Sequence, residues 1–257
     1  MIGVFDSGLG GLSVLAALVK ALPQADFTYY ADTAHVPYGD KPDTLIQRRV
    51  LAVGAELVTQ GATLLVVACN TATAAAVQAL RTAHPGIPVV GVEPGIKPAA
   101  ASSRTGRIAV LVTPSTARST RLRHLIESHA GGVEVHVEPC PDWATHVETL
   151  RLDDPALIAD VQRRIASILD RDADRIVLGC THYSFLVPVI APLIADRAEL
   201  IDVADAVARQ TQRLAGSLTH GRGQIHLTAS AHPERLHAAL PRLRLAYLAA
   251  RVTTRNL

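Results

Sequence analysis

Aromatic residues, charged residues and cysteines are all scarce in this sequence of 257 residues. Only 4% of the residues are aromatic although 49% are hydrophobic, so the core must consist mainly of Val, Ile, Leu and Ala. Such a core suits parallel sheets and helices better than an antiparallel sandwich. The formal net charge is +2 and the basic residues are scattered, which excludes the basic stripe of a nucleic-acid-binding protein.

Three cysteines are a small and odd number, which argues for reduced thiols rather than a disulfide framework. The apolar runs are too short and too often interrupted to span a bilayer. The sequence begins with the strand-like Ile2-Gly3-Val4-Phe5, which leaves no room for a signal peptide. We therefore expect a cytoplasmic protein that does not enter the membrane.

What the sequence contains is a regular alternation of short apolar runs and helical patterns, which indicates buried parallel strands that feed helices. In the first half we expect strands over 2–5, 27–31, 64–68 and 89–92, and helices over 12–21, 44–60 and 73–82. Prolines and small polar residues between 94 and 103 mark a boundary. Beyond it we expect strands over 108–112 and 133–137 and just before Cys180, and helices over 119–130 and 155–169.

The second half repeats the pattern of the first. Ile108 corresponds to Ile2 and Cys180 to Cys69 at a nearly constant spacing, which indicates an internal duplication. The tail from about 204 carries a helix and a weak strand over 224–228, and it could pack on either half.

Cys69 and Cys180 each end an apolar run and precede small polar residues. Ligands bind at the carboxyl ends of strands in open α/β sheets, so two thiols in matching halves indicate acid/base groups that face each other across one substrate. We expect a helix N-terminus after each cysteine, which would lower its pKa. The alternatives are an inert buried Cys69 and a core His182. Cys140 lacks a polar motif, and we expect it to be structural.

Metal binding is not expected, because the sequence has no Cys-x-x-Cys pair and no His spacing typical of zinc.

A glycine-rich segment, 6–13, joins the first strand to the first helix. It could be a turn that needs positive φ, or a nucleotide-binding loop with Asp32 at the ribose. Ser13 at the third glycine position and the Asp6 carboxylate, which would repel a phosphate, both oppose nucleotide binding. We favour a carboxylate and a hydroxyl, Asp6 and Ser7, beside an ammonium group or a catalytic thiol.

Five spaced motifs closely resemble those of the glutamate racemase family, a branch of the cofactor-independent aspartate/glutamate racemases. They are Asp-Ser-Gly-x-Gly-Gly at 6–11, Tyr-Tyr-Ala-Asp at 29–32, Pro-Tyr-Gly at 37–39, Cys-Asn-Thr-Ala at 69–72 and Gly-Cys-Thr-His-Tyr at 179–183. The resemblance implies an α/β fold of two pseudo-symmetric domains, each a mainly parallel sheet flanked by helices, with the active site at their interface. The first domain would comprise 1–96 and about 208–257, and the second 97–207.

The resemblance further implies an enzyme that interconverts L-glutamate and D-glutamate without a cofactor and supplies D-glutamate for peptidoglycan. Cys69 and Cys180 would be the catalytic acid/base pair, with Asp6 and Ser7 supporting the first and His182 and Glu148 the second. The residues implied to hold the substrate are Asp6, Ser7, Pro37, Tyr38, Gly39, Cys69, Asn70, Thr71, Thr113, Thr116, Thr181 and His182. We also expect a homodimer that binds no nucleic acid.

The physical logic of such a reaction agrees with this motif pattern. Inverting a stereocentre requires one group to remove the α-proton and an opposed group to return one on the other face. A thiol, with a reference pKa of about 8.5, is far more acidic than an amino-acid C–H, so the site must also stabilise the carbanion. Asn70, Thr71 and Thr181 are the expected donors.

The sequence departs from the family pattern around Glu148. The segment before this glutamate is often Phe-Val-Pro-Leu-Val in the family, whereas here it is Trp143-Ala144-Thr145-His146-Val147, and Ser184 stands where proline is usual. Aspartate or another carbon acid remains an alternative substrate. A nucleotide-binding enzyme and a non-enzymatic binding protein are alternatives of other classes.

Overall fold

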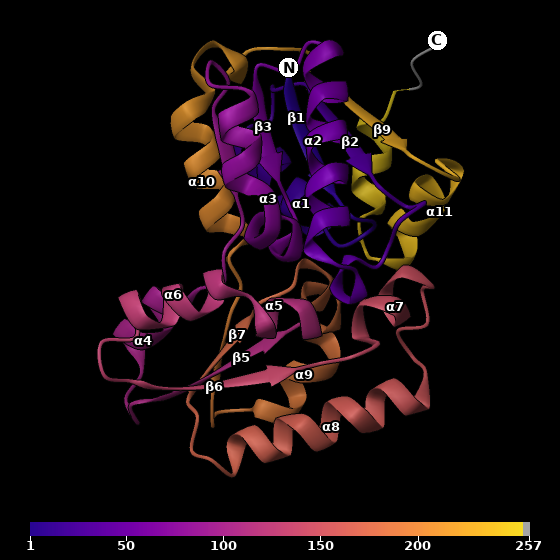
Figure 1. The fold of residues 1–257 in the computed structure, drawn as a ribbon. Coiled ribbons are helices and arrows are strands. Elements are labelled where there is room, and N and C mark those ends of the chain that lie inside the picture. Colours follow the sequence, from indigo (N-terminus) through magenta and orange to yellow (C-terminus); the bar gives the residue numbers. More distant parts are fainter. Residues whose placement is uncertain (254–257) are drawn as a thin grey trace.

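The computed structural model describes residues 1–253, which form two α/β units, one above the other in Figure 1. The strands of the first unit are β1 (Ile2–Asp6), β2 (Phe27–Ala31), β3 (Leu64–Val67), β4 (Val89–Gly91) and β9 (Ile225–Ala229). Those of the second are β5 (Arg107–Val112), β6 (Glu134–Pro139), β7 (Arg175–Leu178) and β8 (Glu199–Ile201). Neighbouring strands in both sheets are parallel, which confirms the predicted α/β class.

The helices fall into two groups that follow the two sheets (Figure 1). Around the first sheet are α1 (Leu12–Ala21), α2 (Asp43–Thr59), α3 (Asn70–Ala83), α10 (Ala204–Ala215) and α11 (Glu234–Arg242). Around the second are α4 (Ile96–Ser102), α5 (Pro114–Arg118), α6 (Thr120–His129), α7 (Trp143–Glu148), α8 (Pro155–Leu169) and α9 (Val187–Ile194). Short 3-10 helices are η1 (Tyr38–Asp40), η2 (Thr181–Leu186), η3 (Gly216–Thr219) and η4 (Ala246–Arg251).

The two sheets share one strand order, as the predicted duplication requires. The first sheet runs β4-β3-β1-β2-β9 and the second runs β8-β7-β5-β6. Pairing β1 with β5, β2 with β6, β3 with β7 and β4 with β8 makes these orders identical, apart from β9 at one edge. Cys69 and Cys180 therefore follow topologically equivalent strands, β3 and β7.

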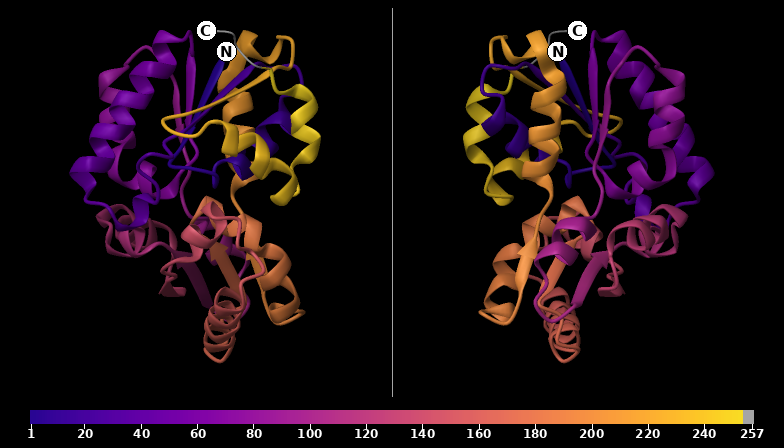
Figure 2. Two further views of the ribbon diagram at one scale, coloured as in Figure 1. Left: turned by 90° about the vertical axis from the view of Figure 1, so that its right-hand side faces the viewer. Right: turned by 90° about the vertical axis from the view of Figure 1, so that its left-hand side faces the viewer.

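Alternating side chains of the strands pack into different helix layers. In β3, Leu64 and Val66 join the core that contains α1 and α10, whereas Leu65 and Val67 join the core of α2 and α3. This two-residue period is that of a sheet buried on both faces. Figure 2 shows the first sheet nearly edge-on between these helix layers.

The structure corrects several local expectations. The boundary segment 94–103 contains α4, in which Pro98 is tolerated because it lies in the first turn, where backbone N–H groups have no intrahelical acceptor. The helix after Cys69 begins at Asn70, three residues before the expected start. Cys180 is followed by the 3-10 helix η2 rather than by an α-helix N-terminus.

The tail lies with the first sheet, since β9 pairs with β2 and α10 packs along α1. The domain boundaries near 96 and 208 stay predictions. None of the helices within residues 1–253 combines the length and apolar character that a membrane span requires.

Candidate active site

The two cysteines at the ends of β3 and β7 are almost equally buried, at 5% and 6% exposed. They lie close enough together that a charge on Cys180 would raise the pKa of Cys69. Cys140, in contrast, lies after β6, where its buried thiol donates to the Glu138 carbonyl at 3.5 Å.

Cys69 is the N-cap of α3, and its Sγ accepts from the Ala72 N–H at 3.4 Å. Its thiol donates to Ser7 Oγ at 3.8 Å. Burial, and next the negative charge of Asp6, raise the pKa of Cys69 well above its usual value and outweigh the Ala72 N–H, which lowers it. The expected lowering of this pKa by the helix N-terminus is therefore wrong as a net effect, and the Cys69 thiol is protonated at neutral pH.

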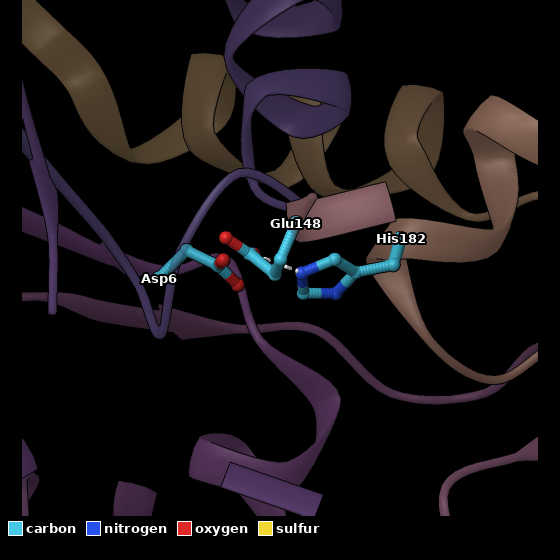
Figure 3. Close-up of side chains that lie close together, drawn as sticks. All are labelled: Asp6, Glu148 and His182. Carbon is cyan, nitrogen blue, oxygen red and sulfur yellow. Dashed lines mark hydrogen bonds and ion pairs between the residues drawn. The ribbon is translucent and has the colours of Figure 1, made fainter. Parts of the chain in front are cut away.

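Cys180 stands at one end of a chain of polar contacts. Its Sγ lies 3.6 Å from His182 Nδ1, and His182 Nε2 lies 2.5 Å from Glu148 Oε1 (Figure 3). Burial lowers the pKa of His182, but the contacts with Cys180 and Glu148 outweigh it, so the pKa is raised well above its usual value. The Cys180 Sγ therefore lies beside a ring that tends to carry a positive charge.

Asp6, the last residue of β1, is fully buried between the two units. Its Oδ2 accepts from the Gly8 N–H at 2.7 Å, and its Oδ1 accepts from Thr181 Oγ1 at 3.5 Å. Burial raises the pKa of Asp6, opposed chiefly by the charge of His182. The structure thus brings Asp6, which was expected beside Cys69 alone, close to the Cys180 side as well.

Ligand atoms of Asp6, Glu148 and His182 all lie within 4.8 Å of one another (Figure 3). Two carboxylates and an imidazole are a donor set that suits divalent cations. Because Nε2 and Oε1 are at hydrogen-bond distance, an ion would have to displace the proton that they share. The absence of a metal from the reaction stays a prediction.

The glycines of the 6–13 segment permit a close approach of the second unit. A Cβ at Gly8 would lie 2.1 Å from Glu148 Oε1, and one at Gly10 would lie 2.4 Å from His182 Nδ1. Glu148 Oε1 also accepts from the Leu9 N–H at 2.6 Å. Neither Gly8 nor Gly10 has positive φ, so close approach, not turn geometry, explains these glycines.

Hydroxyls from both units meet at the start of α3. Thr71 Oγ1 lies 3.1 Å from Thr113 Oγ1 and 3.2 Å from Thr116 Oγ1, and all three residues are buried. Beside them, the side-chain oxygen and nitrogen of Asn70 are buried without a hydrogen-bond partner among residues 1–253. Buried polar atoms normally have a hydrogen-bond partner, so the Asn70 amide has both its donor and its acceptor capacity left for a bound molecule.

Asp32, which the motif resemblance did not place among the site residues, supports the 37–39 loop. Tyr38 donates its hydroxyl to Asp32 Oδ2 at 2.7 Å, and Arg49 binds both carboxylate oxygens of Asp32 at 2.9 Å. On the other side, a Cβ at Gly39 would lie 3.0 Å from Thr113 Cβ. The loop that begins at Pro37 thus reaches the second unit.

Asp32 directly follows β2, just as Asp6 ends β1. This position at the carboxyl end of a strand could have indicated from the sequence that Asp32 lies at the site. Arg49 carries no such signal, because only the packing of α2 brings it to Asp32.

The chain resembles known racemases in sequence and structure. The sequence model of the Asp/Glu/Hydantoin racemase family matches residues 2–211. The glutamate racemase of Pseudomonas aeruginosa is 44% identical over 244 residues, which cover 93% of this chain and 92% of that protein. The structure of Escherichia coli glutamate racemase in complex with L-glutamate and an activator is 30% identical, with a TM-score of 0.80 and 94% of each chain covered. A glutamate racemase isoform from Bacillus anthracis is 29% identical, with a TM-score of 0.83 over 100% of this chain and 97% of that one.

Proposed function

This chain belongs to the Asp/Glu/Hydantoin racemase family, and we propose that it interconverts L-glutamate and D-glutamate by a two-cysteine reaction that needs no cofactor. The observation that carries this proposal is the unequal environment of two equivalent thiols. Cys69 is kept protonated by burial and by Asp6, whereas Cys180 adjoins an imidazolium. One thiol and one thiolate are what a proton transfer through a substrate requires.

In the mechanism, the Cys180 thiolate removes the α-proton of one enantiomer and becomes a thiol. The Cys69 thiol donates its proton to the opposite face of the carbanion and becomes a thiolate. The other enantiomer reacts with the two roles exchanged, and a proton must pass between the cysteines before the starting form of the free enzyme returns. Each turnover therefore conserves protons and needs no redox partner.

Preorganised hydrogen-bond donors around the substrate would stabilise the carbanion. Asn70 is the strongest candidate because its amide is buried and unpaired among the described residues. Thr71, the next residue, and Thr181, whose hydroxyl lies 3.5 Å from Asp6 Oδ1, are the further donors that we propose. Donors aimed at developing negative charge typically lower a barrier by several kcal/mol, about 3–4 kcal/mol for one donor.

The test is circular dichroism of the purified protein with L-glutamate and no added cofactor, together with NMR of α-proton exchange in D2O. We expect the signal of L-glutamate to decay to zero as the racemate forms. A constant signal would overturn the proposal. A panel of D-amino acids that includes D-aspartate tests the alternative substrate, and calorimetry with NAD and ATP tests nucleotide binding.

Location, cellular role and oligomeric state complete the proposed function. We propose that the enzyme is cytoplasmic, supplies D-glutamate for peptidoglycan and forms a homodimer. Complementation of a D-glutamate auxotroph tests the first two points, and sedimentation equilibrium tests the third.

A further inference from the structure

Glu148 lies at the end of a helix that cannot hold its position alone. Helix α7 has six residues, and its N-cap, Asp142, has φ 64° and makes no side-chain cap hydrogen bond. Leu150, two residues beyond the helix, also has a positive φ of 56°. Non-glycine residues with positive φ cost free energy, and isolated helices of this length do not persist in water. Tertiary contacts must therefore orient Glu148.

Several of these contacts involve Trp143, the first residue of α7. Its side chain is 1% exposed, and its Nε1–H donates to Asp160 Oδ2 on α8 at 2.8 Å. Asp160 is itself held by Arg164 Nε at 2.7 Å. The Trp143 ring also meets the Tyr183 ring edge-on, with 5.2 Å between the centroids and 68° between the planes. Trp143 thus joins α7 both to α8 and to η2.

Tyr183 directly follows His182, and its hydroxyl donates to the Cys140 carbonyl at 3.0 Å. Side-chain contacts therefore join the segments 140–148 and 180–183 near both ends of the first segment. Trp143 packs on Tyr183 at one end, and Glu148 binds His182 at the other. Because α7 lies between these two connections, the aromatic contact and the Leu9 N–H bond together set where Glu148 stands relative to His182.

We propose, on the basis of the proposed racemase function, that Trp143 is a positioning residue: by packing on Tyr183 it helps to hold Glu148 against His182 and so keeps the His182 ring beside Cys180. None of the contacts described above joins Trp143 to Cys69, to Cys180 or to a residue predicted to bind the substrate. We therefore expect its effect on the reaction to pass through Glu148 and through His182, which directly precedes Tyr183.

The test compares Trp143→Leu with Trp143→Phe. W143L removes the ring, and we expect kcat to fall about 10- to 100-fold, the range typical of displaced catalytic groups. Since Glu148 helps to raise the pKa of His182, loosening it should move the basic limb of the kcat profile to lower pH. W143F keeps the ring contact, and we expect kcat within about twofold of wild type and an unchanged pH profile.

A double-mutant cycle with Glu148→Gln separates positioning from general destabilisation. If Trp143 acts through Glu148, adding W143L to E148Q should change kcat by no more than about twofold. The matched control is Ile168→Val, a fully buried change on α8, which should lower stability and leave the pH profile in place. If W143L does not fold, Tyr183→Leu removes the same ring contact from the other side and carries the same expectation.

Different results would overturn the proposed racemase function and the positioning role of Trp143. A wild-type protein that does not racemise glutamate overturns the function. An active wild-type protein overturns the inference alone if W143L keeps the basic limb in place, or if its loss of kcat multiplies with that of E148Q.

Discussion

His182 Nδ1 lies 3.6 Å from Cys180 Sγ, and this contact makes two topologically equivalent thiols electrostatically different. The corresponding neighbours of Cys69 are the Ser7 hydroxyl and the Asp6 carboxylate. An imidazolium favours a thiolate, whereas a carboxylate favours a thiol. The duplicated fold places two thiols at the ends of equivalent strands, and their different neighbours give them different electrostatic surroundings.

Replacing either of the two proposed catalytic cysteines should strongly reduce racemisation and leave half of the chemistry. We expect Cys69→Ala and Cys180→Ala to lower kcat by roughly 10²- to 10⁴-fold, since each removes one acid/base group. The surviving thiol should still exchange the α-proton with D2O, on one enantiomer in the first variant and on the other enantiomer in the second. NMR of L-glutamate and D-glutamate in D2O measures this exchange.

The same enantiomer exchanging in both variants would contradict the opposed arrangement. Cys140→Ala is the matched control, because this thiol donates only to a backbone carbonyl. Its activity should stay within about twofold of wild type, as for a buried thiol that acts only as a small hydrophobe.

Alkylation should distinguish the two thiols at neutral pH. Their exposed fractions, 5% and 6%, are too similar to decide the rates, whereas the raised pKa of Cys69 leaves that residue with little reactive thiolate. We expect iodoacetamide to modify Cys180 before Cys69, as measured by peptide mass spectrometry. Because Asp6 raises the pKa of Cys69, Asp6→Asn should speed the modification of Cys69, and faster labelling of Cys69 in the wild type would refute this assignment.

Substitution of His182 should affect the two directions of the reaction unequally. The equilibrium constant of a racemisation is one, so kcat/KM must remain equal in both directions for every variant, and any bias must appear in kcat and KM separately. We expect His182→Asn to lower kcat more for the enantiomer that Cys180 deprotonates. Initial rates from each pure enantiomer supply the measurement, and equal reductions in both kcat values would count against the role of His182 at Cys180.

A methyl group at Gly8 should separate the two units at the site. The added Cβ would lie 2.1 Å from Glu148 Oε1 and would disrupt the bond from the Leu9 N–H. We expect Gly8→Ala to lower kcat about 100-fold and stability by about 1–3 kcal/mol, as overpacking does. Gly86→Ala is the control, since its Cβ would meet nothing within 4 Å. Equal activity of the two variants would show that this approach is not needed.

Weakening the contact between Arg49 and Asp32 should weaken substrate binding, because Asp32 holds Tyr38 of the 37–39 loop. Arg49→Lys loses the two-pronged contact with Asp32, and the loop that carries Tyr38 loses its fixed support. We expect the KM for glutamate to rise about five- to tenfold, equivalent to about 1–1.4 kcal/mol. Arg48→Lys, at the exposed neighbouring position, should leave KM unchanged. A kcat effect without a change in KM would exclude this role.

The sequence by itself determined the alternation of strands and helices, the duplication and the position of each cysteine at a strand end. These features depend on hydrophobic periodicity over a few residues, which the chain carries locally. The motifs also indicated the family, even though Glu148 lies in a segment that departs from the family pattern.

Only the tertiary structure decided the charge states and the supports of the site. A helix N-terminus after Cys69 predicted a lowered pKa, but burial and Asp6 reverse the sign, because charge interactions in a water-poor interior depend on distance in space. Glu148 meets the Leu9 N–H across 139 positions of sequence, and Arg49 and Trp143 reach their partners through helix packing. Contacts of this kind are set by how whole helices pack on sheets, which no local pattern encodes.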